Sequence, residues 1–210
     1  MTKIKICGIK TRDALKAAIQ EKADFIGFVF YKESSRYIDP DLAHDLTNAV
    51  PSVMTNVGLF VDPSDHEIDH VLARADLDMI QLHGTESVAR VRDIRMRWGM
   101  PVIKAIAIGS EADLDQAQPY EKAADWLLFD AKISGSPGGT GQSFDWKILE
   151  KRFIDLPWML AGGLHAGNVG AVLKCLRPGA VDISSGVENA PGCKDPQKIK
   201  EFIAAVRQSG

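Results

Sequence analysis

The chain has 210 residues, of which 45% are hydrophobic and 25% are charged, and its formal net charge is −3. This size and balance indicate a soluble globular protein with one sizeable core, and we expect residues 1–210 to form a single domain. A weakly acidic chain has no electrostatic reason to bind nucleic acid or an anionic membrane surface. A phosphorylated ligand would therefore have to be held by local donors.

Eight short apolar runs of strand length follow one another along the chain. Near-continuous apolarity is typical of parallel strands that are covered on both faces. The predicted strands are 3–7, 25–30, 55–61, 79–82, 102–107, 126–130, 158–161 and 181–184.

Helical patterns fill the intervals between these strands. Ser64 and Glu67 form a capping box ahead of an apolar stripe that runs to Ala75, and Asp195-Pro196 is typical of the start of a last helix. The other predicted helices are 11–23, 41–50, 86–98, 111–119, 145–152 and 166–176. An apolar residue followed by aspartate also recurs just before three strands, at 23–24, 77–78 and 124–125, as a faint internal repeat.

Eight strands that alternate with helices predict an α/β protein, a single (β/α)₈ TIM barrel. The structural alternative is an open, doubly wound sheet, which periodicity alone does not distinguish from a barrel. In a barrel, reactive groups lie at the C-terminal ends of the strands. Unusual residues stand at these ends or in the loops that follow them: Cys7, Arg36, His83, Asp130, Gly163 and the segment 184–186.

Cys7 ends the first predicted strand. A cysteine is most often a small buried hydrophobe, but strand alternation puts Lys5 and Cys7 on one face and two isoleucines on the other. The isoleucines suit the helix-facing side, so Lys5 and Cys7 should point into the barrel. A buried lysine needs a partner, and Asp182 on the adjoining eighth strand is the candidate. The charge of Lys5 would also favour the Cys7 thiolate.

Asp130, Arg36 and His83 each have an ordinary and a functional interpretation. A carboxylate at the end of an apolar run is a helix cap, a loop solvator or a functional acid. A loop arginine is usually solvated, but it can also bind a carboxylate through two parallel hydrogen bonds. A histidine at a strand end can equally be a satisfied core residue, and the residues alone leave these alternatives open.

Glycine- and serine-rich segments follow the last three predicted strands. Segment 138–141 alone is typical of a flexible turn, whereas Gly163 and segment 184–186 follow the seventh and eighth strands, where barrels commonly bind phosphate. Glycines let a phosphate approach backbone N–H groups, and serines add hydroxyl donors. No cluster of histidine, cysteine or carboxylate has metal-ligand spacing, so we expect no metal.

Taken in order, these segments resemble one known family from one end of the chain to the other, that of the phosphoribosylanthranilate isomerases. Each match is weak alone, and their shared order and spacing make the resemblance specific. It is carried by KIKICG at 3–8, GFVF at 27–30, SRYI at 35–38, VGLFV at 57–61, QLHG at 81–84, FD at 129–130, GGTG at 138–141, LAGGL at 160–164 and DISSGVE at 182–188.

The resemblance implies a barrel that needs no cofactor and rearranges N-(5-phosphoribosyl)anthranilate to 1-(2-carboxyphenylamino)-1-deoxyribulose 5-phosphate in tryptophan biosynthesis. It also implies that Asp130 is the general acid, that Cys7 is the general base and that Arg36 contacts the anthranilate carboxylate. The other predicted substrate contacts, which include a phosphate cradle, are His83, Gly141, Gly163, Asp182, Ser184, Ser185 and Gly186.

Two other functions stay open at this point. Another sugar-phosphate barrel would have a similar phosphate site, but indole-3-glycerol phosphate synthase uses a lysine and glutamates rather than the pair Cys7 and Asp130, and a metal-dependent epimerase needs ligands that the sequence lacks. A barrel that binds a phosphorylated metabolite without catalysis would tolerate the loss of Cys7. We expect a small phosphorylated substrate as the partner, and a monomer, with a homodimer as the alternative.

The three cysteines, Cys7, Cys175 and Cys193, are odd in number and form no CxxC pair. A disulfide framework is therefore not expected, which fits a reducing cytosol. Charges interrupt residues 1–10, so this segment resembles neither a signal peptide nor an anchor, and no stretch approaches the roughly 18 apolar residues of a membrane span. We expect a cytoplasmic protein.

Overall fold

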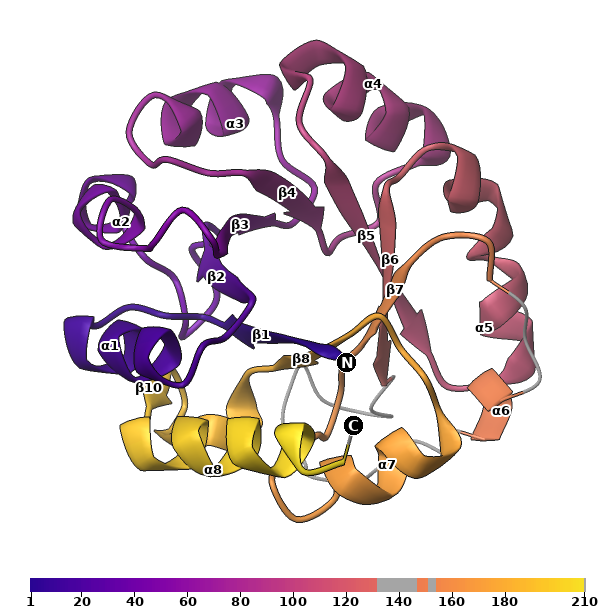
Figure 1. The fold of residues 1–210 in the computed structure, drawn as a ribbon. Coiled ribbons are helices and arrows are strands. Elements are labelled where there is room, and N and C mark those ends of the chain that lie inside the picture. The colour runs from indigo at the N-terminus through magenta and orange to yellow at the C-terminus, as the bar shows by residue number, and fades with distance from the viewer. Residues whose placement is uncertain (132–146, 151–153, 210) are drawn as a thin grey trace.

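The structure, a computed structural model, describes residues 1–131, 147–150 and 154–209. Eight parallel strands pair in chain order, and the pairing of β1 with β8 closes them into a barrel. Figure 1 shows the strands as a central ring with the helices arranged around it. The predicted (β/α)₈ barrel is therefore confirmed, and the open, doubly wound sheet is excluded.

The strands agree with the predicted ones to within one residue at either end. They are β1 (Lys3–Cys7), β2 (Phe25–Val29), β3 (Thr55–Phe60), β4 (Met79–Leu82), β5 (Val102–Ile108), β6 (Trp126–Ala131), β7 (Trp158–Leu160) and β8 (Ala180–Ile183). A short antiparallel hairpin of β9 (Glu188–Ala190) and β10 (Cys193–Lys194) follows β8 and was not predicted.

Most helices are shorter than predicted, and one prediction is wrong. The helices are α1 (Arg12–Gln20), α2 (Pro40–Thr47), α3 (Asp65–Leu72), α4 (Val88–Trp98), α5 (Glu111–Asp115), α6 (Lys147–Glu150), α7 (Val169–Cys175) and α8 (Pro196–Arg207), with 3₁₀ turns η1 (Gln118–Lys122) and η2 (Ser185–Val187). The predicted helix 111–119 ends at Asp115, and Pro119 lies instead in the first turn of η1, where its missing N–H needs no partner. The ends of predicted helix 145–152 lie outside the described residues.

The predicted caps are present at two helix starts. Ser64 and Glu67 form the reciprocal capping box of α3. Asp195 accepts hydrogen bonds from two backbone N–H groups at the start of α8, with proline in the first turn. These side chains satisfy backbone donors that would otherwise lack partners at a helix N-terminus.

The aspartate that recurs before three even-numbered strands has one role throughout. Each carboxylate accepts a hydrogen bond from a backbone N–H near the start of the preceding strand. The pairs are Asp24 with Ile4 at 2.8 Å, Asp78 with Asn56 at 2.7 Å and Asp125 with Val102 at 2.8 Å. The faint sequence repeat therefore joins neighbouring strands at the N-terminal end of the barrel.

Strand alternation divides the buried side chains into an outer and an inner group. The outer cluster packs the sheet against the helices and includes Ile4, Ile6 and Phe129. The inner cluster fills the barrel toward the N-terminal ends of the strands and is made of Phe25, Val57, Met79, Ile103, Ala105, Leu128, Met159, Ala161 and Ala180. Because this end is packed, the polar residues inside the barrel lie toward its C-terminal mouth.

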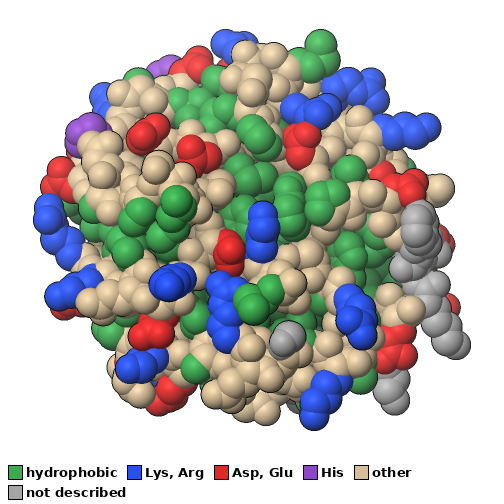
Figure 2. Space-filling model, viewed as in Figure 1, with side chains coloured by type: hydrophobic (Ala, Val, Ile, Leu, Met, Phe, Trp, Pro, Cys, Tyr) green, Lys and Arg blue, Asp and Glu red, His purple; other side chains and the backbone are tan. Residues whose placement is uncertain are grey.

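The surface carries charges of both signs. Figure 2 shows basic and acidic side chains interspersed over one face of the molecule. Within the described part of the chain, no helix combines the length and the apolar character that crossing a bilayer would require. All three cysteines of the chain are described and unpaired.

Candidate active site

Cys7 and Lys5 lie on the inner face of β1, as predicted. The Cys7 side chain packs against Val29 and Leu59 at the barrel mouth and is 4% exposed. Lys5 is fully buried, and its Nζ donates to Asp182 Oδ1 at 3.1 Å. The two residues of this ion pair are register partners on β1 and β8. The predicted Lys5–Asp182 pair is therefore confirmed.

The charges around Cys7 act in opposite directions. Burial raises the pKa of the Cys7 thiol, and the positive charges of Lys5 and Lys194 only partly oppose this increase, while Asp182 adds to it. The predicted direction of the Lys5 effect is confirmed, but burial outweighs it. Burial alone would lower the pKa of Lys5, yet the charges of Asp182 and Cys7 raise it above its ordinary value. Lys5 is thus a stable cation beside a thiol.

Asp130 lies at the end of β6 and takes part in a chain of hydrogen bonds that begins on β4. Its neighbour Leu128 belongs to the inner cluster and Phe129 to the outer one, so alternation turns Asp130 inward. His83 Nε2 lies 3.2 Å from Asp130 Oδ2, and His83 Nδ1 lies 2.9 Å from Gln81 Nε2. The His83 side chain is 31% exposed, so it is not the core histidine of the alternative interpretation.

Arg36, in the loop after β2, is held from one side by Glu188. Its Nε and Nη2 each donate to a Glu188 carboxylate oxygen at 2.8 Å. This bidentate contact orients the planar guanidinium and leaves its remaining N–H groups for another acceptor. Arg36 is thus already oriented on the protein side before any ligand carboxylate arrives.

Glu188 belongs to a buried charge cluster with Lys194. Lys194 Nζ donates to Glu188 Oε1 at 2.5 Å and to the Ser184 carbonyl at 3.1 Å. Burial would raise the pKa of Glu188, but hydrogen bonds from Arg36 and Lys194 outweigh burial and lower it. Burial lowers the pKa of Lys194, and the hydrogen bond with Glu188 only partly opposes this. The hairpin β9–β10 thereby fixes Arg36 and brings a cation toward Cys7.

Ser184 and Ser185 follow β8 and have different surroundings. The Ser184 hydroxyl donates to the Cys7 carbonyl at 3.1 Å and accepts from Lys194 Nζ at 3.1 Å. It therefore joins the ends of β8 and β1, and its predicted substrate contact stays a prediction. Ser185 is exposed and begins η2.

The loops after β7 and β8 meet at two of the predicted glycines. A Cβ on Gly186 would lie 2.0 Å from the Leu164 carbonyl oxygen, so only glycine allows the loops to approach this closely. Asn168 Nδ2 donates to the Gly163 carbonyl at 2.8 Å and holds the turn before α7. Glycine-rich turns of this kind expose backbone N–H groups to anions. Gly141 and the rest of segment 138–141 lie outside the described residues.

Comparison with known proteins identifies the family. A model of N-(5'-phosphoribosyl)anthranilate (PRA) isomerase matches residues 4–205. The isomerase of Paramagnetospirillum magneticum is 51% identical over 207 residues, which cover 97% of this chain and 96% of that protein. This chain belongs to the N-(5'-phosphoribosyl)anthranilate isomerase family. Its activity is that of the family, an isomerisation in tryptophan biosynthesis.

Solved phosphoribosylanthranilate isomerases have the same fold. The Thermotoga maritima enzyme superposes with a TM-score of 0.90 at 37% identity, covering 99% of this chain and 100% of that one. An isomerase in complex with reduced 1-(o-carboxyphenylamino)-1-deoxyribulose 5-phosphate superposes with a TM-score of 0.87 at 36% identity, with the same coverage. The family separates this chain from the other sugar-phosphate enzymes and from the non-catalytic barrel considered above.

Three residues at the mouth of this isomerase barrel were not singled out from the sequence. Glu188 and Lys194 lie on the hairpin that was not predicted, although Glu188 belongs to the segment 182–188 that resembles the family. Gln81 could have been found by alternation, since it shares the inner face of β4 with the site residue His83. Among the described residues, no group of three or more histidines, cysteines and carboxylates could hold a metal ion.

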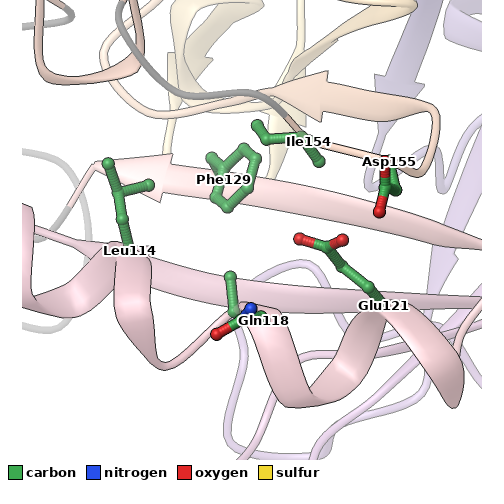
Figure 3. A pocket seen from close by; sticks show the side chains of 7 residues that line it. Leu114, Gln118, Glu121, Phe129, Ile154 and Asp155 are labelled. Carbon is green, nitrogen blue, oxygen red and sulfur yellow. The ribbon is translucent and has the colours of Figure 1, made fainter.

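A cavity behind β6 lies outside the isomerase site. It has a volume of about 250 Å³ and is lined by Leu114, Ala117, Gln118, Glu121, Phe129, Ile154 and Asp155. Figure 3 shows Phe129 among these side chains, with the carboxyl groups of Glu121 and Asp155 turned into the same space. Because Phe129 faces the helices and Asp130 faces the barrel interior, this cavity is behind β6 and contains none of the predicted site residues.

Gly27 makes room for the thiol of the predicted base, and we expect Gly27→Ala to lower kcat. Gly27 is the register partner of Cys7, and a Cβ there would lie 3.0 Å from Cys7 Sγ. Displacement of a reacting group by about 1 Å costs about 100-fold, so a smaller shift of the thiol should lower kcat measurably but by less than this. Steady-state kinetics test this, with Gly170→Ala as the control because its Cβ meets only the end of the Ser209 side chain. Unchanged kcat in Gly27→Ala would contradict the expected crowding.

We expect Lys5→Met to raise the pKa of the Cys7 thiol further. The variant removes the largest influence that lowers this pKa, and the lowering effect of Lys5 exceeds the raising effect of Asp182. The ascending limb of kcat/KM should therefore move to higher pH. The ultraviolet absorbance of the thiolate, titrated against the Cys7→Ala variant in the same background, isolates this group from Cys175 and Cys193. An unchanged titration would show that Lys5 does not lower the pKa of the Cys7 thiol.

Proposed function

We propose that this chain rearranges N-(5'-phosphoribosyl)anthranilate with Asp130 as the general acid and Cys7 as the general base. One observation carries the proposal: the two groups point inward from the C-terminal ends of β6 and β1 in one closed barrel. An acid and a base on different strands around one mouth can reach opposite sides of a bound sugar. The surrounding residues supply contacts for the two ends of the substrate.

The reaction needs one proton donated to oxygen and another removed from carbon. Asp130 gives its proton to the furanose ring oxygen, the bond from that oxygen to the first sugar carbon breaks, and the nitrogen lone pair forms a Schiff base. Cys7, as the thiolate, takes a proton from the second sugar carbon, and the electron pair left behind forms the enol. Tautomerisation of the enol gives the ketone. Protons move without net oxidation or reduction. The general acid and the general base each contribute roughly 10²–10⁴-fold to the rate.

Groups at the barrel mouth suit the two charged ends of the substrate, its carboxylate and its phosphate. The free edge of Arg36 suits the anthranilate carboxylate, because its other edge is already held by Glu188. The turns at Gly163 and Gly186 suit the phosphate, and a solved relative binds a reduced product with the same carboxyl and phosphate groups. Binding at both ends would hold the sugar between Asp130 and Cys7, which is the positional part of catalysis.

The remaining proposed substrate contacts are His83, Asp182 and Ser184. His83 contacts Asp130, Asp182 contacts Lys5 and Ser184 contacts Lys194, so each of these side chains also supports another site residue. Ser185 and Gly141 complete the proposed phosphate contacts. We further propose a single catalytic domain over residues 1–210 that acts in the cytoplasm.

A monomer remains our proposal for the oligomeric state, with a homodimer as the alternative. The Thermotoga maritima relative has been studied in a dimeric form and as monomers generated from it. Sedimentation at several protein concentrations distinguishes the two states of this chain.

Complementation of a tryptophan auxotroph that lacks this isomerase tests the proposed function. Wild type should restore growth without tryptophan, and Cys7→Ala and Asp130→Asn should each fail to do so at equal expression. Cys175→Ala is the matched control, because Cys175 is an exposed thiol outside the barrel. Growth with both site variants would overturn the acid–base assignment.

A further inference from the structure

The fully buried side chain of Gln81, inside the barrel, has one polar atom without a hydrogen-bond partner in the described part of the chain. The side chain is 0% exposed and lies on the inner face of β4, two residues before His83. Its Nε2 lies 2.9 Å from His83 Nδ1, while its Oε1 is buried and has no partner among the described residues. An unpaired buried acceptor is costly and uncommon, and it therefore calls for an explanation.

The contact with Gln81 determines where the ring proton of His83 lies. In this orientation of the Gln81 amide the NH₂ group faces Nδ1, and because an amide NH₂ can only donate, Nδ1 of His83 is then the unprotonated acceptor. A neutral imidazole then carries its proton on Nε2, which lies 3.2 Å from Asp130 Oδ2, so in this tautomer the Nε2–H is the donor and Oδ2 the acceptor. Gln81, His83 and Asp130 thus form a directed chain of donors across β4 and β6.

We infer that Gln81 is a positioning residue that keeps His83 neutral, with its proton on Nε2, and so leaves the catalytic proton on Asp130. This inference rests on the proposed role of Asp130 as general acid. Protonation of His83 at Nδ1 would set this N–H against the Gln81 NH₂, so that two donors would face each other beside a fully buried amide. The competing state, an imidazolium beside an ionised Asp130, would have no carboxyl proton to give to the ring oxygen.

The same arrangement serves the step after proton donation. Once Asp130 has become a carboxylate, the Nε2–H of His83 already points at Oδ2 and stabilises the new charge without reorganisation. The backbone of His83 is fixed as well, because its N–H donates to the Phe60 carbonyl at 2.8 Å. Gln81 thereby acts on the reaction through His83 and does not need to contact the substrate.

Nitrogen NMR of the ring gives a readout that does not depend on turnover. In wild type labelled at histidine, His83 should give the signals of a neutral ring protonated at Nε2 at neutral pH; a His83→Asn spectrum assigns them. Signals of the Nδ1–H tautomer, which a reversed Gln81 amide would produce, or of the imidazolium would overturn the inference. The other histidines serve as internal references: His44, His66, His70 and His165.

Gln81→Glu tests the direction of the effect. A carboxylate would accept a hydrogen bond from Nδ1–H, so His83 should become an imidazolium, and kcat should fall about 100-fold, within the range of about 10²–10⁴ for a general acid. KM should change less than kcat, because the contacts to the carboxylate and phosphate ends of the substrate remain. If this variant does not fold, Gln81→Met removes both hydrogen-bonding groups at similar length and should likewise weaken the Nε2–H signature. A wild-type signature in whichever variant folds would overturn the inference.

The two proposals fail in different ways. If Asp130→Asn keeps full activity while wild-type His83 is neutral and protonated at Nε2, the acid assignment is wrong and the hydrogen-bond chain stands. If Asp130→Asn is inactive while wild-type His83 is an imidazolium, the acid assignment stands and Gln81 does not have the inferred role.

Discussion

Replacement of Asp130 by asparagine should lower kcat by about 10²–10⁴-fold, the usual contribution of a general acid. Asparagine has the shape of aspartate and still offers an oxygen to His83 Nε2, so the 3.2 Å contact can persist. The amide has no proton of comparable acidity to give to the furanose oxygen. KM should change much less, since Arg36 and the glycine turns hold the ends of the substrate. Steady-state kinetics of the purified enzyme measure both quantities.

Asp155→Asn is the matched control for this variant. Asp155 lines the cavity behind β6 and is separated from Asp130 by the sheet, so the same chemical change there should leave kcat unaltered. A higher KM with unchanged kcat in Asp130→Asn would mean that the residue binds substrate and does not donate a proton.

Residues whose position follows from strand alternation were predictable from the sequence. The inward direction of Lys5 and Cys7 follows from a period of two, and the partner of Lys5 follows from barrel closure, which places β8 beside β1. Cys7, Asp130 and Gly163 are close to strand ends, so small errors in strand boundaries do not move them to another face. Strand alternation and barrel closure together fix these positions.

Contacts between loops and between strands that are not adjacent could not be predicted in this way. His83 reaches Asp130 past β5, and this depends on side-chain length and rotamer. Glu188 reaches Arg36 because β9 and β10 form a hairpin of a few residues, too short for any periodic signal. The net direction of the Cys7 pKa shift could not be predicted from the sequence either, because it depends on how completely the thiol is buried.

Removal of one partner of the buried Lys5–Asp182 pair should strongly lower the stability of the fold. Lys5 is 0% exposed and Asp182 is 7% exposed, so Asp182→Leu would leave a buried ammonium group with its main partner gone. Breaking a buried pair in this way costs about 3–5 kcal/mol of unfolding free energy. The double variant Lys5→Met/Asp182→Leu replaces both charges with apolar groups of similar length and should recover most of this loss. Urea unfolding of the wild type and the variants gives the comparison.

An exposed pair provides the control for this stability cycle. Arg12 and Asp45 lie 3.4 Å apart with side chains 79% and 64% exposed, so Asp45→Leu should leave the unfolding midpoint unchanged within error. If the double Lys5→Met/Asp182→Leu variant is as unstable as Asp182→Leu alone, the loss arises from crowding at position 182 and not from an unpaired charge. Recovery of stability with low activity would mean that the pair is retained for the chemistry of Cys7, since an apolar barrel interior would fold equally well without it.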